Sequence, residues 1–318
     1  MRHTAKKIGT LLLTMVLVSL FVFLSCSYIS GDAAERMLGT EATPERLAAL
    51  RAELGLDKPM AVRYVEWFAA LLRGDMGVSY HYRLPVAQLI AERLRPTLTL
   101  TVMAFVLIVA ISIPVGVVTA KYAGGTLDRV VTVLGQLVMS VPALFIGILF
   151  TYLFGLVLRL FVPGAFPAWQ DGAARYLGYL FFPALSIALP RVAMTVRLLR
   201  GCILDEAQKD YVRTSMARGR SRGDILYRHV LKNTLVPLVT FLAMTVAELV
   251  AGSVIIEQVF SIPGLGRLLI SGISNRDAPV VQAVVTLVAF WVVICNLAGD
   301  LLGRRIDPRL RGSEGGRA

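Results

Sequence analysis

Residues 205–237 read DEAQKDYVRTSMARGRSRGDILYRHVLKNTLVP, and about a third of them are charged. Strongly apolar runs lie on both sides of this stretch. Of the 318 residues in the chain, 56% are hydrophobic and only 17% are charged, whereas an average soluble domain carries about 25% charge. The composition therefore predicts an all-α integral membrane protein in which residues 205–237 form a polar insertion between two spans.

Six apolar runs approach the length that a helix needs to cross about 30 Å of hydrocarbon. They cover residues 8–24, 97–120, 129–154, 179–196, 236–256 and 280–302. The first run has the basic start of a signal peptide, but SCS at 25–27 is a poor cleavage site, so we expect an uncleaved span. The fourth contains Pro183, Pro190 and Arg191. Helix breakers are tolerated where neighbouring protein satisfies the freed backbone groups, so we expect this helix inside the bundle.

Basic residues exceed acidic residues on alternate loops. Segment 197–235 has nine basic and four acidic residues, and both terminal tails are net positive, whereas loop 25–96 has nine of each. The positive-inside rule then predicts that both termini and segment 197–235 are cytoplasmic. The net charge of +12 is shared among several cytoplasmic segments instead of one basic face, so we expect a membrane partner and no nucleic acid.

The outer loop is predicted to be folded. Thr43 is a plausible N-cap of a helix that closes at Gly55, and a second helix closes at Gly74 with Tyr64 and Trp67 on one stripe. We interpret these aromatic residues as the core of a small domain, and segment 85–96 as an amphipathic interfacial helix. The expected organisation is a tail and first span at 1–24, an outer helical domain at 25–96, a membrane domain at 97–303 and a basic cytoplasmic tail at 304–318.

Motifs of catalytic chemistry are absent from the sequence. There is no GxxxxGK[ST] phosphate loop and no GxSxG elbow. The three histidines and three cysteines have no metal-ligand spacing. We therefore expect a chain that is not an enzyme and binds no metal or cofactor. Glu248 is a mid-span acid, which costs about 2.5–3.5 kcal/mol on insertion scales; we expect it to line a path or to pair with Arg191.

Residues 205–237 predict two short cytoplasmic helices. Glu206 would open the first, over 206–218, where an acid suits the helix dipole. Gly219 permits the left-handed turn that ends a helix. Ser221 would cap the second helix in a capping-box-like arrangement with Asp224, and Pro237 would mark re-entry into the membrane. Such a hairpin presents a rigid knob to a partner.

The residues of this hairpin resemble the EAA loop of binding-protein-dependent ABC import permeases. The resemblance lies in Glu206 and Ala207, Gly219 thirteen residues after the glutamate, and then Ile225, His229, Leu231, Asn233 and Pro237. Gln208 departs from the pattern, since it replaces the second alanine. Segments 54–79, 92–101, 139–155, 182–200 and 252–285 extend the resemblance to the dipeptide, oligopeptide and nickel branch, with this chain as the first permease subunit type.

The resemblance implies a multi-pass permease of the bacterial inner membrane. Its partners would be a second homologous permease, usually in a heterodimer, two ATPase subunits that bind ATP and Mg, and an extracytoplasmic binding protein. It implies that the ATPase-coupling residues are Glu206, Ala207, Asp210, Arg218, Gly219, His229, Asn233 and Pro237, and that the path or gate involves Glu248, Arg191, Pro263, Gly264, Arg276 and Asp277. Among the substrates of this branch, the resemblance favours di- and oligopeptides over nickel or other metal chelates and glycosides.

Two alternatives stay open at this point. One is a permease of another ABC class, or an exporter. The other is a stand-alone secondary carrier, although the sequence shows no pair of the inverted repeats that carriers usually have.

Overall fold

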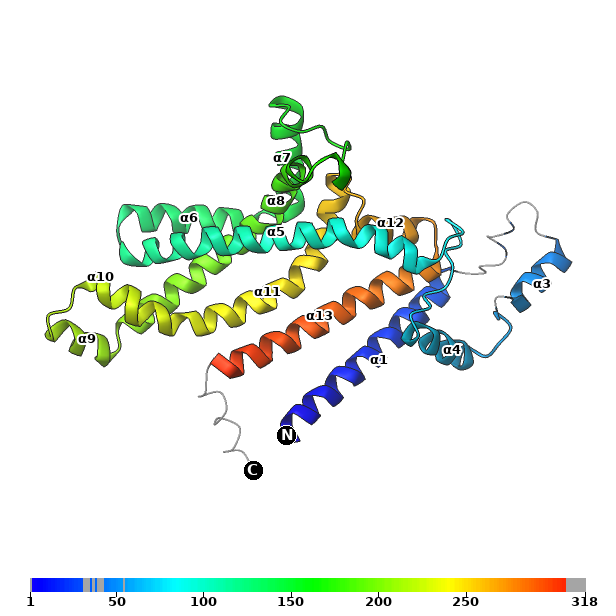
Figure 1. The fold of residues 1–318 in the computed structure, drawn as a ribbon, viewed down its shortest axis with the longest axis horizontal. Coiled ribbons are helices and arrows are strands. Elements are labelled where there is room, and N and C mark those ends of the chain that lie inside the picture. Colours follow the sequence, from blue (N-terminus) through cyan, green and yellow to red (C-terminus); the bar gives the residue numbers. More distant parts are fainter. Residues whose placement is uncertain (1, 31–34, 36–37, 39–42, 54, 307–318) are drawn as a thin grey trace. The chain divides into compact units, whose positions relative to one another are not determined.

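A computed structural model describes residues 2–30, 35, 38, 43–53 and 55–306 of the chain. Its helices are α1 (Arg2–Ser30), α3 (Pro44–Glu53), α4 (Met60–Leu72), α5 (Val86–Lys121), α6 (Thr126–Ser140), α7 (Ala143–Phe150), α8 (Ala173–Ala207), α9 (Asp210–Ala217), α10 (Arg222–Ile225), α11 (Leu231–Val259), α12 (Leu265–Ser274) and α13 (Ala278–Ile306) (Figure 1). Two π-helical segments, η2 (Thr151–Val157) and η4 (Leu226–Val230), and one 3₁₀ turn, η3 (Trp169–Asp171), complete the described elements. The expected all-α class is confirmed.

The chain forms two compact units. Unit 1 comprises Met1–Thr97 and Pro263–Val293, and unit 2 comprises Leu98–Ile262 and Ile294–Ala318. Helices α5 and α13 therefore each contribute one segment to each unit. The domain boundaries predicted from the topology follow a different criterion and stay a prediction. Most of the predicted cytoplasmic tail, residues 307–318, lies outside the described residues.

Among the described helices, five are long and apolar enough to cross a membrane, and a bent helix pair raises the number to six. This agrees with the expected six spans, but several bounds differ. The predicted interfacial segment 85–96 and the second span are one continuous helix, α5, with Pro96 inside it. The predicted amphipathic helix is therefore present but continuous with the second span, and its place at the membrane interface stays a prediction.

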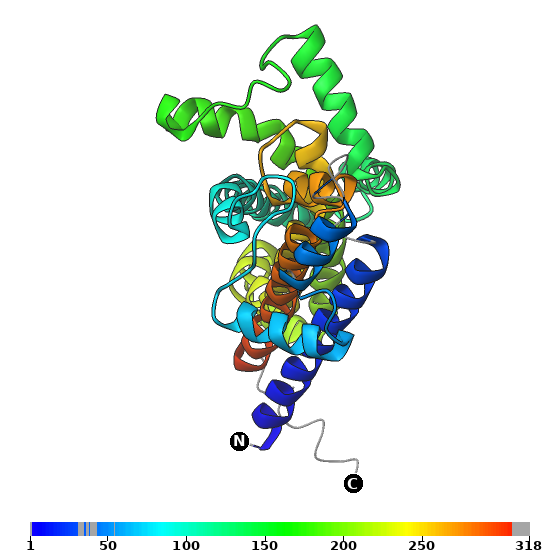
Figure 2. The same cartoon turned by 90° about the vertical axis from the view of Figure 1, so that its right-hand side faces the viewer.

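The third predicted span is broken. Helices α6 and α7 are bent by 97° at Val141 and Pro142, and Figures 1 and 2 show α7 leaving the direction of α6. Val141 has φ −95° and ψ 122°, since the ring of a following proline disfavours the helical conformation. A single straight helix over 129–154 is therefore the wrong prediction for this segment.

Helix α8 lies at the centre of unit 2, as its proline content predicted. It contacts α6, α7 and α11, and its apolar window is the most buried among the described candidate spans, at 61%. The buried core includes Leu180, Ala184, Ala188 and Leu199 on α8. Pro183 and Pro190 lie inside this helix, where the lost backbone hydrogen bonds are sheltered by protein instead of lipid.

In unit 1, α4 packs against α1. The ring of Phe23 meets those of Tyr64 and Trp67, and Ser19 Oγ lies 2.9 Å from Tyr64 Oη. The predicted helices of the outer loop are present, with positive φ at Gly55 and Gly74 where they close. No residue of α4 is fully buried, so its aromatic side chains are half-buried against the first span and do not form a separate enclosed core.

Candidate functional site

The hairpin between α8 and α11 differs from its prediction at its first helix. Glu206 and Ala207 are in the last turn of α8, which ends before Gln208. Helix α9 begins at Asp210, with Lys209 as its extended N-cap residue. Asp210 is therefore the acid in the first turn of α9, and the expectation that Glu206 opens this helix is wrong. The apolar pattern of α8 simply continues past the predicted end of the fourth span.

The turn of the hairpin follows the prediction. Gly219 has a φ of +80°, which L side chains rarely adopt. The amide of Asp224 donates to Ser221 Oγ over 3.2 Å, so the predicted cap is confirmed. Helix α10 passes through η4 directly into α11, and Pro237 lies inside α11. The second hairpin helix is thus continuous with the fifth span, and the entry into the membrane at Pro237 stays a prediction.

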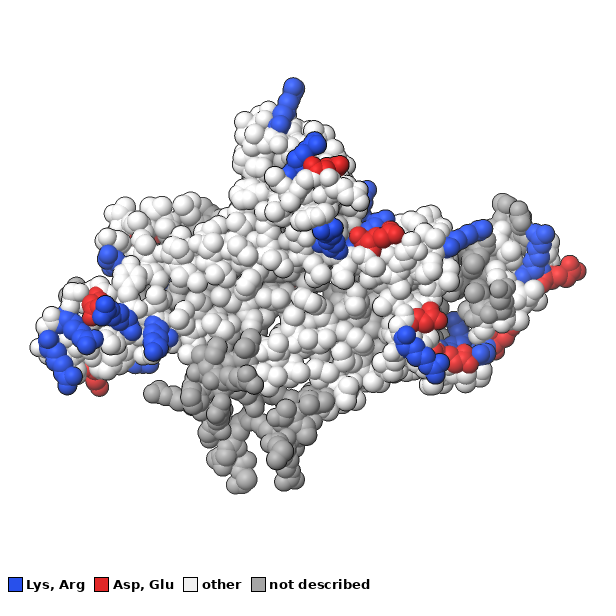
Figure 3. Space-filling model, in the orientation of Figure 1, with Lys and Arg blue, Asp and Glu red and all other residues white. Residues whose placement is uncertain are grey.

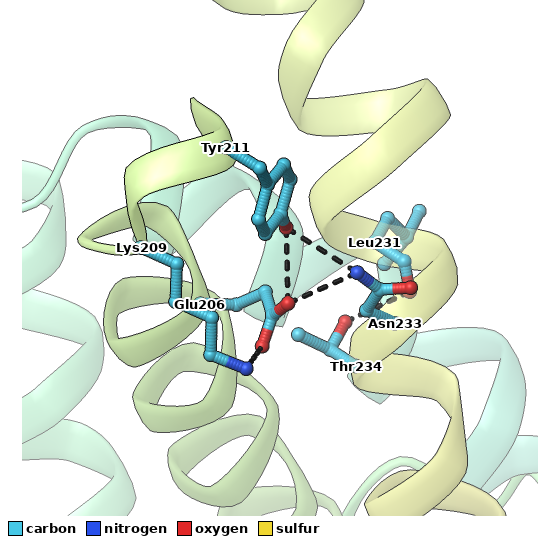
Figure 4. A network of polar contacts seen from close by, with 6 residues as sticks. All are labelled: Glu206, Lys209, Tyr211, Leu231, Asn233 and Thr234. Carbon is cyan, nitrogen blue, oxygen red and sulfur yellow. Dashed lines mark hydrogen bonds and ion pairs between the residues drawn. The ribbon is translucent and has the colours of Figure 1, made fainter. Parts of the chain in front are cut away.

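Glu206 joins three segments of the hairpin (Figure 4). Tyr211 Oη and Asn233 Nδ2 each donate to Glu206 Oε1 over 3.0 Å, and Lys209 Nζ forms an ion pair with Glu206 Oε2. An acid at the C-terminal end of a helix opposes the helix dipole. Three donors from the α8–α9 linker, α9 and α11 compensate for that position, so the network fastens α9 to both long helices.

Apolar anchors lie behind this network. Val212 on α9, Ile225 on α10 and Val230 on η4 are 1–2% exposed and belong to the core of unit 2. Burial raises the pKa of Tyr211, and its hydrogen bond to the Glu206 carboxylate raises that pKa further. Tyr211 therefore stays a protonated donor at neutral pH, as the network requires.

The outer face of the hairpin is polar and basic. Arg218 is exposed. Arg220 contacts His229 and lies 3.9 Å from Asp224, which also pairs with Arg228. Figure 3 shows these charges gathered over α9 and α10. Next to them, an open cavity of about 610 Å³ is lined by Cys202, Asp205, Glu206, Lys209, Tyr211, Asn233, Thr234, Val236 and Pro237.

Arg191 on α8 and Glu248 on α11 form an ion pair. This agrees with the expectation that Glu248 pairs with Arg191. The side chains are 31% and 53% exposed, respectively. The pair therefore lies on a surface of unit 2 and is open on one side.

The residues expected at an outer path or gate lie in the segment before α12 and in the turn between α12 and α13. Pro263 precedes Gly264, the extended N-cap residue of α12. Residues 261–266, which read SIPGLG, therefore lead into a helix. Arg276 is exposed with a φ of 51°. Asp277 is 1% exposed. The path or gate roles implied for Pro263, Gly264, Arg276 and Asp277 stay a prediction.

Asp277 is a buried acceptor inside unit 1. Ser79 Oγ donates to its carboxylate, and the amides of Tyr80 and His81 donate over 3.2 Å each. Burial raises the pKa of Tyr80, and the nearby Asp277 carboxylate raises it further. The three donors fix the 79–81 loop to the start of α13.

An ion pair between α6 and α8 was not predicted from the sequence. Arg200 Nε and Nη2 donate to the two carboxylate oxygens of Asp128 over 2.6 and 2.8 Å, and the Gly124 amide donates to Asp128 over 2.8 Å. The partners are 72 residues apart, and no local pattern connects them. Within the described residues, no group of three or more His, Cys, Asp or Glu side chains is arranged to hold a metal ion.

Comparisons with known proteins agree with this architecture. Residues 112–312 match the family of binding-protein-dependent transport system inner membrane components, and residues 1–101 match the N-terminal region of such membrane components. A solved structure of the MetNI methionine ABC transporter in an inward-facing form has a TM-score of 0.57 and 21% identity. It covers 69% of this chain and 97% of that chain, and shows a shared fold.

Curated relatives cover nearly the whole chain. A probable peptide ABC transporter permease of Sinorhizobium fredii is 35% identical over 309 residues, which is 97% of this chain and 99% of the relative. A glutathione transport system permease of Pectobacterium atrosepticum is 36% identical over 304 residues, which is 96% of this chain and 95% of the relative. With its apolar helices and these matches, the chain belongs to the family of inner membrane components of binding-protein-dependent transport systems, the permease subunits of ABC importers.

Proposed function

We propose that this chain forms half of the translocation path of an ATP-driven importer for di- and oligopeptides, and that the 205–237 hairpin is the surface through which an ATPase subunit moves it. The names of its relatives, which specify peptides and glutathione, support peptides over metal chelates or glycosides. Family membership favours this reading over a stand-alone carrier.

The Glu206 network carries the proposal. It ties α9 to the end of α8 and to the start of α11, while the basic outer face of the hairpin stays exposed. A partner that binds this face and displaces α9 therefore displaces two of the long helices with it. ATP binding shifts the permease between conformations only if the ATPase contacts differ between them, and a rigid hairpin is the element that senses such a difference.

The remaining elements of the proposal concern partners and orientation. We infer a heterodimer with a second, similar permease, delivery by an extracytoplasmic binding protein, and both termini in the cytoplasm, as the basic loops indicate. The chain itself would break no bond and hold no cofactor, since ATP and Mg would be bound by the ATPase subunits. Arg218 and His229 would contact the ATPase, whereas Glu206, Asn233 and Gly219 would hold the hairpin in shape.

Disulfide crosslinking in intact membranes tests the contact. Met216 on α9 is 43% exposed, and Met216→Cys would be made in a background without the three native cysteines. Combined with a cysteine introduced on the surface of the ATPase subunit and oxidised with copper phenanthroline, it should form a disulfide with that subunit, and the crosslink should block peptide uptake until it is reduced. Val65 on α4, 64% exposed, is the matched control, and Val65→Cys should capture no ATPase. Absence of capture from Met216→Cys, with uptake retained, would refute the coupling role.

A further inference from the structure

The Arg191–Glu248 ion pair joins two candidate spans, α8 and α11. Arg191 is 16 residues before the end of α8 at Ala207, and Glu248 is 17 residues after the start of α11 at Leu231. At 1.5 Å per residue these distances are about 24 and 26 Å along the helices. Both helices extend beyond the membrane into the predicted cytoplasmic segment 197–235. From that segment Arg191 lies about 9 Å and Glu248 about 20 Å along its helix, so within about 30 Å of hydrocarbon Glu248 is the deeper of the two charges.

The exposure of the pair shows what kind of environment it faces. Arg191 is 31% and Glu248 is 53% exposed, and a charge turned toward lipid inside the membrane is strongly disfavoured. Glu248 belongs to an exposed stripe on α11 with Met244, Ala251, Ile255 and Gln258, whose spacing places them on one helical face. A face that carries an acid and an amide suits a water-filled path between permease subunits.

One methionine contacts Arg191, and another lies on the exposed stripe of α11 that carries Glu248. Met194 Sδ lies 3.9 Å from Arg191 Nη1, and Met194 and Met244 are 37% and 43% exposed. Methionine is flexible and polarizable, and it fits varied apolar partners. Fixed charges of opposite sign beside such side chains match a ligand whose charged ends are constant and whose side chains vary.

We propose that Arg191 and Glu248 form a subsite for the charged termini of a peptide in transit, in which Glu248 receives the terminal ammonium and Arg191 the terminal carboxylate. The inference rests on the proposed function and adds a recognition step inside the membrane. Without peptide, the two side chains neutralise each other. Because solvent-accessible ion pairs contribute little stability, a peptide can replace each partner at small cost.

Uptake by the complete complex, reconstituted with its binding protein, tests this subsite. The probes are a tripeptide with free termini, its N-acetylated form and its C-terminal amide, each at a concentration that saturates the binding protein in a separate binding measurement. Loss of one charged contact of about 1.4 kcal/mol corresponds to about a tenfold effect. We expect each blocked peptide to be taken up about tenfold more slowly by the wild type.

The variants assign each terminus to one residue. Glu248→Gln should abolish the preference for a free amino terminus, Glu248→Asp should keep it, and Arg191→Gln should abolish the preference for a free carboxylate. Arg197→Gln, at an exposed arginine on the same helix, should keep both preferences. Preferences that are unchanged in Glu248→Gln and Arg191→Gln would overturn the proposal.

Exchange of the two charges distinguishes recognition of the peptide from an ion pair that only holds α8 and α11 together. The double variant Arg191→Glu with Glu248→Arg retains opposite charges at the two positions. We expect the double variant to assemble but to take up the tripeptide with free termini about tenfold more slowly than the wild type. Uptake at the wild-type rate would overturn the proposed subsite. A wild-type complex that assembles but shows no ATP-dependent peptide uptake would instead refute the proposed function, which is a separate result.

Discussion

Removal of the Glu206 carboxylate should release α9 from the two long helices. In Glu206→Ala, the Tyr211 and Asn233 side chains lose an acceptor at 3.0 Å. A hydrogen bond to a charged group contributes about 1.5–3 kcal/mol, whereas the ion pair with Lys209, which is 53% exposed, adds little. Since Tyr211 and Asn233 can still bond to each other, we expect α9 to lose about 2–3 kcal/mol of local stability.

Hydrogen exchange of the α9 amides measures this loss directly. A change of about 2–3 kcal/mol corresponds to roughly 30- to 150-fold faster exchange if opening is in rapid equilibrium. In the reconstituted complex, stimulation of ATP hydrolysis by the loaded binding protein should fall in parallel, while the complex still assembles. Asp205→Asn, a change at the adjacent exposed acid, is the control. Unchanged protection of 210–217 in Glu206→Ala, or an equal loss in Asp205→Asn, would refute the reasoning.

Three further predictions concern local geometry. Gly219→Ala should destabilise the hairpin by about 1–2 kcal/mol because of the positive φ alone, and reduce uptake; Gly223→Ala, without that φ and with open space around it, should be neutral in the same uptake and exchange assays. Asp277→Ala leaves the buried Ser79 hydroxyl and the part-buried amides of Tyr80 and His81 without their acceptor, so about 2–3 kcal/mol should be lost and the 79–81 loop should become sensitive to added protease; equal protease resistance would contradict this. Arg200→Lys cannot reproduce the two-pronged contact with Asp128, and should lower the thermal midpoint of the purified complex by more than Arg197→Lys does.

Hydropathy predicted most of the membrane architecture, because the length of an apolar run is a direct consequence of bilayer thickness. It failed where a single residue pair decided the backbone. Val141 and Pro142 interrupt the third run without any loss of hydrophobicity, and the amphipathic stretch before the second run continues as helix. Average polarity over a window does not record either feature.

The site shows the same division. Gly219 and Ser221 were predictable, since a left-handed turn and a helix cap depend on neighbouring residues only. The position of Glu206 at the end of α8 was not, because its three donors come from separate segments. Asp277 joins a loop almost 200 residues earlier in the chain, and such a contact has no local signature. Glu206 and Asp277 could be identified as candidates from the sequence, but their hydrogen-bond partners could be identified only from the folded structure.

The cytoplasmic part of α8 is a helical segment without proline. From Arg191 to Glu206 the helix contains no proline, and the nearest one, Pro190, lies directly beyond the ion pair. We expect α8 to bend most readily at Pro190, because a proline inside a helix removes a backbone hydrogen bond, and the segment from Arg191 to Glu206 to move as one piece about 23 Å long. By simple geometry, a tilt of about 10° displaces its cytoplasmic end by about 4 Å but scarcely moves Arg191. A displacement of several ångströms at the hairpin would thus leave the Arg191–Glu248 pair nearly in place, so the outer half of α8 could keep its packing while the cytoplasmic half moves.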